Sequence, residues 1–353
     1  MRTLYYRDST GNFGDDLNEW LWDKAWPEKP REETNDNLVL VGIGTIFGLH
    51  PPPADAEKIV IGTGVGYDPI PPLDDKWHIL AVRGPLSARA LGIDPALAQT
   101  DGAALLRALP QYGKPAGERT GGIVFMPHLS ARLGKWEAVC KRAGIEFLNP
   151  QWDSHLLLSR IEQADLVLAD AMHAAICADA LRVPWVPCVT SAEISSFKWT
   201  DWSSSVGLPY RPNFLPFSSV LEYARDRIVR RFGKPHCLDE QLLAEIGDDR
   251  ERMQQVLLDN FAKNFSPEHL QTAHQKRRYK RAMNVIKFMR KSRLELLWSP
   301  IDAIMVARAA KALKALTNRP SYLSEDKDLD RAVAGLKDAL RRASDLARRL
   351  THG

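Results

Sequence analysis

The chain has 353 residues, 44% hydrophobic and 26% charged, a composition typical of a soluble globular protein longer than one average domain. It has no run near the roughly 20 apolar residues that a membrane-spanning helix needs, and its amino terminus lacks the apolar core of a signal peptide, so we expect a cytoplasmic location. The net charge of +4 conceals an asymmetry. Residues 1–220 carry 20 Lys and Arg against 26 Asp and Glu, whereas residues 221–353 carry 28 against 18. The four cysteines show no C-x-x-C spacing, which argues against a disulfide framework or a zinc site.

Short apolar runs alternate with helical patterns along the first 215 residues. The short runs predict strands at residues 3–7, 38–42, 58–62, 77–82, 121–126, 166–169 and 185–189. Apolar residues at helical spacing predict helices at residues 16–26, 85–91, 135–143 and 156–163. Strands interleaved with helices favour parallel sheets wound by right-handed crossovers, and hence an α/β fold.

We predict three regions along the chain. A Gly- and Pro-containing stretch at 112–117 is a candidate hinge between α/β domains at residues 1–115 and 116–217. The cleft between these domains is the expected place for an active site. From residue 218 to 353 the pattern is helical and predicts a C-terminal helical appendage. Its helices are expected at residues 219–231, 239–246, 249–262, 267–291, 299–316 and 328–351.

His173 lies where the predicted strand 166–169 gives way, after Asp170, to an alanine-rich helix. Ligands of open α/β sheets bind outside the carboxyl ends of the strands. A helix amino terminus at such a place attracts anions and disfavours the imidazolium form of histidine. His173 is therefore a candidate acid or base beside a phosphorylated substrate. The alternative is a partly buried helix residue that bonds a neighbouring carbonyl.

The loop after the first strand offers a second candidate, Gly11-Asn12-Phe13-Gly14-Asp15-Asp16. Its glycines allow a ligand to approach the backbone closely, and its carboxylates can orient sugar hydroxyls. The alternative is an ordinary strand-to-helix turn in which Asp15 caps the helix. The Gly-rich loops at 42–48 and 62–66 lack the spacing of the dinucleotide fingerprint, so we expect no nicotinamide cofactor.

Further polar residues follow other predicted strands. Arg83 ends the strand 77–82 and could hold a phosphate or carboxylate through two parallel hydrogen bonds; the alternative is a surface arginine paired with an acid. Asp101 and His128 also follow strand-like runs, with a helix cap and a structural role as their alternatives. Lys198 and Trp199 lie among aromatic residues in the loop expected after the strand 185–189, where a lysine could meet an anion beside a stacked sugar ring. The alternative there is simple packing.

Four of these segments together resemble the polysaccharide pyruvyl transferase family, in particular its exopolysaccharide ketal-forming bacterial branch. The segments are Gly11-Asn12-Phe13-Gly14-Asp15, Val82-Arg83-Gly84-Pro85-Leu86-Ser87, Thr100-Asp101-Gly102-Ala103 and Asp170-Ala171-Met172-His173-Ala174-Ala175. The resemblance covers residues 3–210. It implies two Rossmann-like domains in a glycosyltransferase-B-like arrangement, with phosphoenolpyruvate as the donor co-substrate.

The resemblance also assigns residues to the donor. His173 takes the place of the histidine of an Arg-Leu-His motif, and Arg83 matches an arginine associated with the donor. Here the motif reads Ala171-Met172-His173, so the family's arginine is absent. We suggest Lys198 as its replacement.

The expected reaction forms a pyruvate ketal on two sugar hydroxyls. His173, Asp15 and Asp16 are the predicted catalytic residues. The donor is expected to contact Arg83, Lys198 and His128, and the acceptor Asn12, Gly14, Asp101 and Trp199. No metal-ligand cluster is evident in the sequence, so we expect neither a metal nor another cofactor.

The segment 270–294 carries nine basic residues and no acid, interleaved with apolar ones. Such a basic amphipathic helix is expected to bind the inner leaflet of a membrane, near a lipid-linked oligosaccharide or polysaccharide acceptor. The alternative is a solvated basic face packed on its own domain. Nucleic acid is not an expected partner, because no recognised reading motif accompanies the charge.

Two other functions are compatible with these patterns. One is a glycosyltransferase of the B fold with a nucleotide-sugar donor. The other is a catalytically silent relative that binds carbohydrate or a membrane partner, an idea suggested by the missing arginine.

Overall fold

Two separate parallel β-sheets form the framework of the computed structural model, which describes residues 1–30, 37–48, 52–112, 119, 121–266, 272–292 and 297–352. The first sheet has the order β1-β2-β3-β4 and the second the order β6-β5-β7-β8-β9, with every pair parallel. The first comprises β1 (Arg2–Leu4), β2 (Leu38–Val41), β3 (Glu57–Thr63) and β4 (Trp77–Val82). The second comprises β5 (Ile123–Met126), β6 (Glu146–Phe147), β7 (Leu166–Ala169), β8 (Trp185–Val189) and β9 (Asn213–Phe214). The α/β class predicted from the alternation is confirmed.

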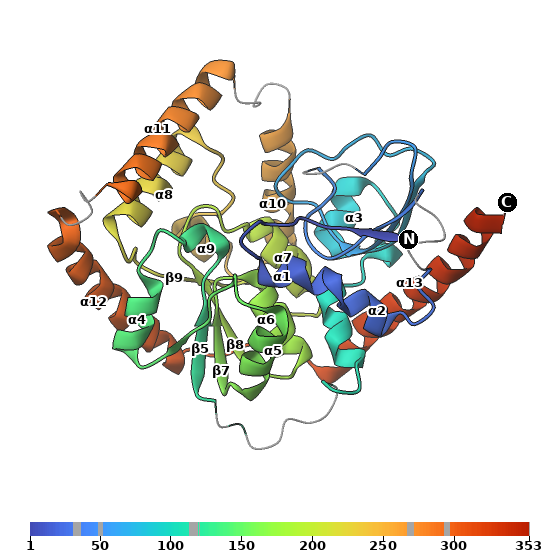
Figure 1. Cartoon of the computed structure of the whole chain (residues 1–353), viewed down its shortest axis with the longest axis horizontal. Helices are drawn as coiled ribbons and strands as arrows, with labels where there is room; N and C mark the ends of the chain where they lie inside the picture. Colours follow the sequence, from blue (N-terminus) through green and yellow to red (C-terminus); the bar gives the residue numbers. More distant parts are fainter. Residues whose placement is uncertain are drawn as a thin grey trace.

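Helices cover both sheets (Figure 1). Those within the first 217 residues are α1 (Phe13–Asp16), α2 (Leu21–Ala25), α3 (Pro85–Leu91), α4 (Trp136–Ala143), α5 (Ser154–Gln163), α6 (Met172–Ala180) and α7 (Ser196–Ser205). Short 3₁₀ helices occupy Leu17–Glu19, Pro95–Leu97, Gly102–Ala108 and Leu129–Ala131. The predicted helices 85–91, 135–143 and 156–163 are confirmed to within two residues.

The single helix predicted at 16–26 is wrong, because α1, a 3₁₀ turn and α2 divide that segment. The buried Asn18 explains the break. Its amide donates to the carbonyls of Asp15 and Ile43, and its oxygen accepts from the Ile43 N–H and the Trp22 indole. A side chain engaged with the backbone in this way competes with regular helix.

The loop predicted after β8 is also wrong, since residues 196–205 form α7. Ser195 caps this helix by accepting the Lys198 N–H. Trp199 and Trp202 then turn inward against Trp185, with ring centroids 6.0 and 5.3 Å from it. Burial of these rings holds α7 against the second sheet.

The region after residue 218 is helical, as predicted. It contains α8 (Val220–Phe232), α9 (Glu240–Ile246), α10 (Arg250–Phe265), α11 (Ala273–Lys291), α12 (Ser299–Ala315), a 3₁₀ turn (Leu316–Asn318) and α13 (Asp326–His352). Within the described ranges, no helix combines the length and the apolar character needed to cross a bilayer.

Two of these helices complete the cores of the sheets. In α13, Leu329, Leu336 and Leu340 belong to the same buried cluster as Ile59 and Ile61 of the first sheet. Figure 1 shows α13 reaching from the second sheet back to the first, and α12 lying beside α4. The predicted C-terminal appendage is therefore wrong for α12 and α13, because both helices contribute to buried clusters of the two sheets. The hinge predicted at 112–117 lies, apart from Tyr112, outside the described residues, and the domain boundaries stay predictions.

Candidate active site

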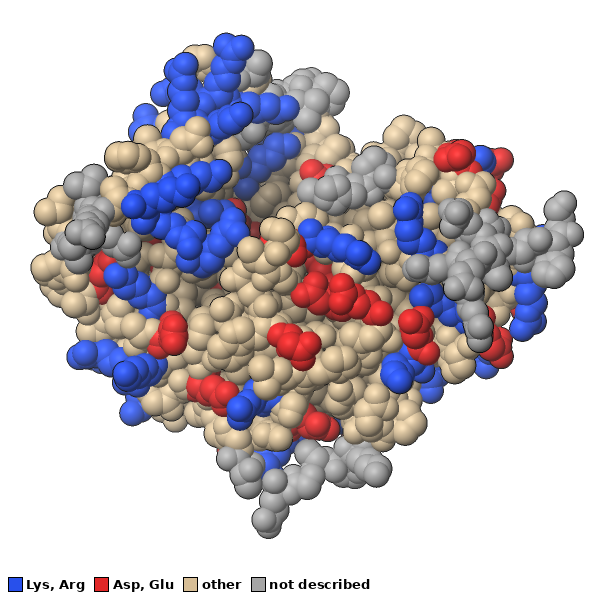
Figure 2. Space-filling view, viewed as in Figure 1, with Lys and Arg blue, Asp and Glu red and all other residues tan. Residues whose placement is uncertain are grey.

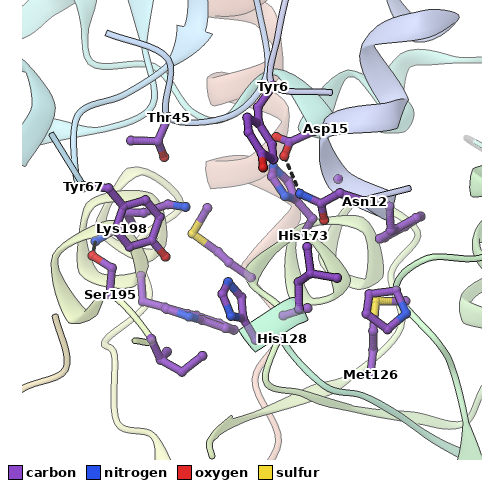
Figure 3. A pocket seen from close by; sticks show the side chains of 18 of the residues that line it. Tyr6, Asn12, Asp15, Thr45, Tyr67, Met126, His128, His173, Ser195 and Lys198 are labelled. Carbon is purple, nitrogen blue, oxygen red and sulfur yellow. Dashed lines mark hydrogen bonds between the residues drawn. The ribbon is translucent and has the colours of Figure 1, made fainter. Parts of the chain in front are cut away.

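A cavity of about 440 Å³ lies between the carboxyl ends of the two sheets. Residues that follow β1, β2 and β3 line one side of it, and residues that follow β5, β7 and β8 line the other (Figure 3). The polar and ionisable side chains among its lining residues are Tyr6, Asn12, Asp15, Thr45, Tyr67, Asp68, His128, His173, Ser195 and Lys198. Parallel sheets bring such strand ends together, which is why ligands bind there.

His173 stands in the first turn of α6, as predicted, and its ring lies against Gly14. Its Nε2 atom is 3.8 Å from Oδ1 of the fully buried Asp101, and neither His173 Nε2 nor Asp101 Oδ2 has a hydrogen-bond partner among the described residues. Burial, reinforced by Lys198 and then Arg83, lowers the pKa of His173 to about 3, so the imidazole of the free protein is neutral. Burial raises the pKa of the Asp101 carboxyl to about 6. The two groups form a histidine–carboxylate pair that a small movement would join.

Asp101 therefore lies behind the catalytic candidate and not on the cavity wall. Its Oδ1 accepts the Ala103 N–H at 3.0 Å and caps the 3₁₀ helix there. Because Asp101 is fully buried, a direct contact with the acceptor, as expected from the sequence, does not fit this placement. We reassign it as a residue that positions His173.

Gly14 has a role that the sequence did not reveal. A Cβ atom built on it would lie 1.8 Å from His173 Nδ1, which is impossible without displacing the ring. The absent side chain is thus what admits the imidazole to this position.

We expect Gly14→Ala to lower turnover by about 10²-fold, since a displacement near 1 Å of a reacting group has that scale of effect. Alanine would otherwise suit this helical position better than glycine by about 0.5–1 kcal/mol. Turnover and thermal unfolding, measured on the same preparation, check this. Normal turnover in the variant would show that His173 is not held by Gly14.

Asp15 and Asp16 have different surroundings. The Asn12 amide donates to Asp15 Oδ2, and burial raises the pKa of the Asp15 carboxyl while Lys198 opposes that shift. Asp16 does not line the cavity: its Oδ2 accepts the backbone N–H of Asn12 at 2.8 Å. Asp15 is thus placed to act as a base toward the cavity, whereas Asp16 holds the start of α1.

Lys198 projects from the first turn of α7 into the same cavity as His173 (Figure 3). Its Nζ lies 4.4 Å from the centroid of the Tyr67 ring, and its methylenes pass Gly66, where a Cβ would come within 2.8 Å of Cγ. Burial lowers the pKa of Lys198, and Arg83 lowers it further, while Asp15 raises it. Lys198 is therefore the candidate anion-binding group among the described residues that line the cavity.

Arg83 is fully buried and does not line the cavity. Its Nε donates to Asp201 Oδ2 at 3.0 Å, Nη2 to the Val65 carbonyl at 2.7 Å, and Nη1 to Thr45 Oγ1 at 3.4 Å. The Asp201 carboxylate also accepts from the backbone N–H and the hydroxyl of Ser87. Because Asp201 belongs to α7, this network ties α7 to α3 and to the Thr45 loop. Direct donor binding by Arg83, expected from the sequence, is at odds with these contacts.

Arg83→Lys is expected to lower the free energy of unfolding by about 1–3 kcal/mol, because one ammonium cannot serve both Asp201 and the Val65 carbonyl and leaves a buried acceptor unpaired. Urea denaturation measures this loss. Unchanged stability combined with weaker donor binding would instead restore Arg83 as a direct ligand.

His128 lies where three cavities meet. Neighbouring cavities of about 320 and 440 Å³ both share it with the main one. The Ser130 N–H donates to Nδ1 at 3.2 Å, so Nε2 carries the proton, and burial lowers the pKa of the ring to about 3. Trp199 lines the cavity but is only 2% exposed and stacks on Tyr210, so little of its ring is accessible to a stacked sugar.

Comparison with known proteins places these residues in a family. The sequence is 39% identical over 227 residues to the succinoglycan biosynthesis protein ExoV of Rhizobium meliloti (strain 1021). The aligned region covers 63% of this chain and 70% of the relative. The chain belongs to the ExoV family. No family model matches the sequence, and no solved structure matches it.

In this member of the ExoV family, sequence reasoning missed Tyr6, Thr45, Tyr67, Asp68 and Ser195. Tyr6 and Ser195 belong to no distinctive motif. Thr45 lies inside the Gly-rich loop 42–48, and Tyr67 and Asp68 directly follow the Gly-rich loop 62–66, both of which we weighed only as dinucleotide fingerprints. Gly64 in the second loop is close to Ser87 and Arg83, so its glycines make room for neighbouring side chains. The described residues contain no group of three or more His, Cys, Asp and Glu side chains that could hold a metal ion.

Proposed function

We propose that the chain takes part in exopolysaccharide synthesis as a pyruvyl transferase. It would move the enolpyruvyl group of phosphoenolpyruvate onto two hydroxyls of a sugar in a polysaccharide repeat unit, forming a pyruvate ketal. Similarity to a succinoglycan biosynthesis protein supports the exopolysaccharide role. The observation that carries the chemistry is one cavity that joins a neutral histidine with a buried acid behind it, a half-buried lysine and a second buried acid.

The donor carries a phosphate and a carboxylate. Lys198 supplies a positive charge, and the first turn of α6, which has no side-chain cap, lines the same cavity through Ala171, Met172 and His173. The Nε2–H of His128 can donate a further hydrogen bond. Preorganised donors in a buried cavity stabilise developing negative charge more than water does. These groups are the proposed donor site.

The proposed reaction begins with protonation of the donor's methylene carbon by His173, which leaves an oxocarbenium-like central carbon. A sugar hydroxyl attacks that carbon and gives its proton to Asp15. The C–O bond to phosphate then breaks, with the electron pair leaving on phosphate, and the second hydroxyl closes the ring. The proton that Asp15 takes from the first hydroxyl makes up for the proton that His173 gave. The proton of the second hydroxyl leaves on inorganic phosphate. General acid–base groups of this kind contribute about 10²–10⁴-fold.

Donor binding is expected to take up protons near neutral pH. The pKa of free His173 is about 3 because the ring is buried beside cations. A phosphate and a carboxylate placed next to the ring favour its charged form and raise that pKa. Affinity should therefore rise as the pH falls. Calorimetric titration of phosphoenolpyruvate in buffers with different ionisation enthalpies measures the proton count. No uptake, or the same uptake in His173→Ala, would contradict the assignment.

The decisive assay follows phosphate release from phosphoenolpyruvate with a panel of lipid-linked oligosaccharides. Acceptor-dependent release, with a ketal in the product, supports the proposal. Thermal stabilisation by nucleotide sugars and not by phosphoenolpyruvate would favour a glycosyltransferase instead. Absence of binding by either donor class would indicate a catalytically silent member. The facing carboxyl ends of the two sheets support the proposed glycosyltransferase-B-like arrangement.

A further inference from the structure

The outward side of α11 is almost uniformly basic. Ile286, on the opposite side, is buried, and α11 packs on α8. The exposed side carries eight cations, none of which forms an ion pair with another described residue: Lys276, Arg277, Arg278, Lys280, Arg281, Lys287, Arg290 and Lys291. Figure 2 shows the blue side chains gathered over this helix beside a hollow in the same face of the molecule. The cations are thus not held in local pairs.

Large apolar side chains stand on the same surface. Val285 and Phe288 of α11 are 55% and 66% exposed. Phe288 lies three residues after Val285, three before Lys291 and seven after Arg281, spacings that share one face of a helix. The basic side of α11 therefore has an apolar centre.

The start of the next helix carries a second apolar stripe on the same flank. Leu297, two residues before α12, and Ile301 and Ile304 of α12 are 72%, 54% and 71% exposed, while the other side of α12 packs on α4. Arg308 and Lys311 continue the same stripe at spacings of four and three. Seven residues separate α11 from α12, and Figure 1 shows the two helices along one flank of the molecule.

This clustering is specific to the flank. Among the described residues, the five large hydrophobic side chains that are more than half exposed all belong to this surface. Every other exposed large hydrophobic side chain is 48% exposed or less. Apolar groups ringed by cations are the pattern of helices that lie in a membrane interface, with the apolar groups among the acyl chains and the cations at anionic headgroups.

We propose that the exposed sides of α11 and α12, called here the α11–α12 surface, dock the protein onto an anionic phospholipid bilayer. Charge complementarity selects this occupant, because eight cations without an acid match a negative surface. The five exposed apolar side chains select a bilayer over a nucleic acid, whose phosphates would leave them in water.

The α11–α12 surface lies near the catalytic cavity, so docking would bring a membrane-bound acceptor close to it. Only this functional link rests on the proposed function. The cavity of about 320 Å³ is lined by Tyr279 of α11 and by Lys234, and it shares Tyr67 and His128 with the catalytic cavity. An acceptor held by its lipid in the membrane would reach the catalytic cavity through this neighbouring cavity.

Flotation of the full-length protein with vesicles tests the surface. We expect binding to vesicles of phosphatidylglycerol and phosphatidylcholine, little binding to phosphatidylcholine alone, and weaker binding as salt rises. Lys287→Glu/Lys291→Glu should weaken binding at least about tenfold. The matched control, Lys24→Glu/Lys337→Glu, changes the net charge equally at exposed lysines of α2 and α13 and should bind normally. Phe288→Ser/Ile304→Ser should release the protein at a lower salt concentration than the wild type.

Three results would overturn the proposal: no binding to anionic vesicles, equal weakening by the matched control, or duplex DNA binding that Lys287→Glu/Lys291→Glu abolishes while vesicle binding persists.

Turnover with a lipid-free oligosaccharide separates this inference from the reaction. The α11 variants should retain that turnover. A wild type that binds anionic vesicles but releases no phosphate from phosphoenolpyruvate would keep the surface and reject the reaction.

Discussion

Replacing His173 by alanine is expected to lower turnover by about 10²–10⁴-fold, the usual contribution of a positioned acid or base. The imidazole lines the cavity and lies 3.8 Å from Asp101, and its Nε2 has no hydrogen-bond partner among the described residues. Because Gly14 opposite it has no side chain, removal of the ring leaves a gap and no clash. Steady-state phosphate release measures the loss, and circular dichroism checks the fold.

The matched control is His155→Ala. His155 is exposed on α5 and lies outside the cavity, with its ring 4.5 Å from that of Trp20. It should retain normal turnover. If His173→Ala turned over at a near-normal rate, the proton would have to come from another group, and His128 would be the next candidate.

The sequence could place residues at strand ends but not the partners behind them. His173, Asp15 and Lys198 meet because each follows a parallel strand, and that placement was predictable from the order of elements. Arg83 also follows a strand, yet its guanidinium turns inward to Asp201, 118 residues later. Nothing in the local pattern around Arg83 distinguishes a buried ion pair from an anion ligand. Asp101 is a similar case, because its place behind His173 depends on how two segments 72 residues apart pack.

Tertiary contacts also decided where the predicted elements failed. The helix expected at 16–26 is interrupted because Asn18 bonds to the loop after β2. The aromatic stretch after β8 forms a helix because Trp199 and Trp202 have Trp185 to pack against. The strands β6 and β9 span two residues each, too few for a sequence pattern, and exist through pairing with β5 and β8. Periodicity predicted the long helix α13, but not that it returns to the first sheet.

Replacing Lys198 by alanine is expected to lower kcat/KM for phosphoenolpyruvate by about 10- to 100-fold, the range of a hydrogen bond to a charged group. Ala171, at the position where the sequence resemblance leads us to expect an arginine, cannot contact phosphate, and Arg83 is committed to Asp201. Among the described residues that line the cavity, Lys198 is left as the half-buried lysine or arginine. Its loss should leave KM for the acceptor unchanged.

A pH profile separates this role from a structural one. Burial lowers the pKa of Lys198, so its charge is present at low pH and is lost at a pH below that at which an ordinary lysine titrates. In the wild type, kcat/KM for the donor should therefore fall on the alkaline side as Lys198 loses its proton. The Lys198→Ala enzyme starts without this charge and should lack that alkaline limb, whereas Lys24→Ala, at an exposed lysine of α2, should keep it. Equal weakening of donor and acceptor binding, or an unchanged alkaline limb in Lys198→Ala, would show that the donor is held by other groups.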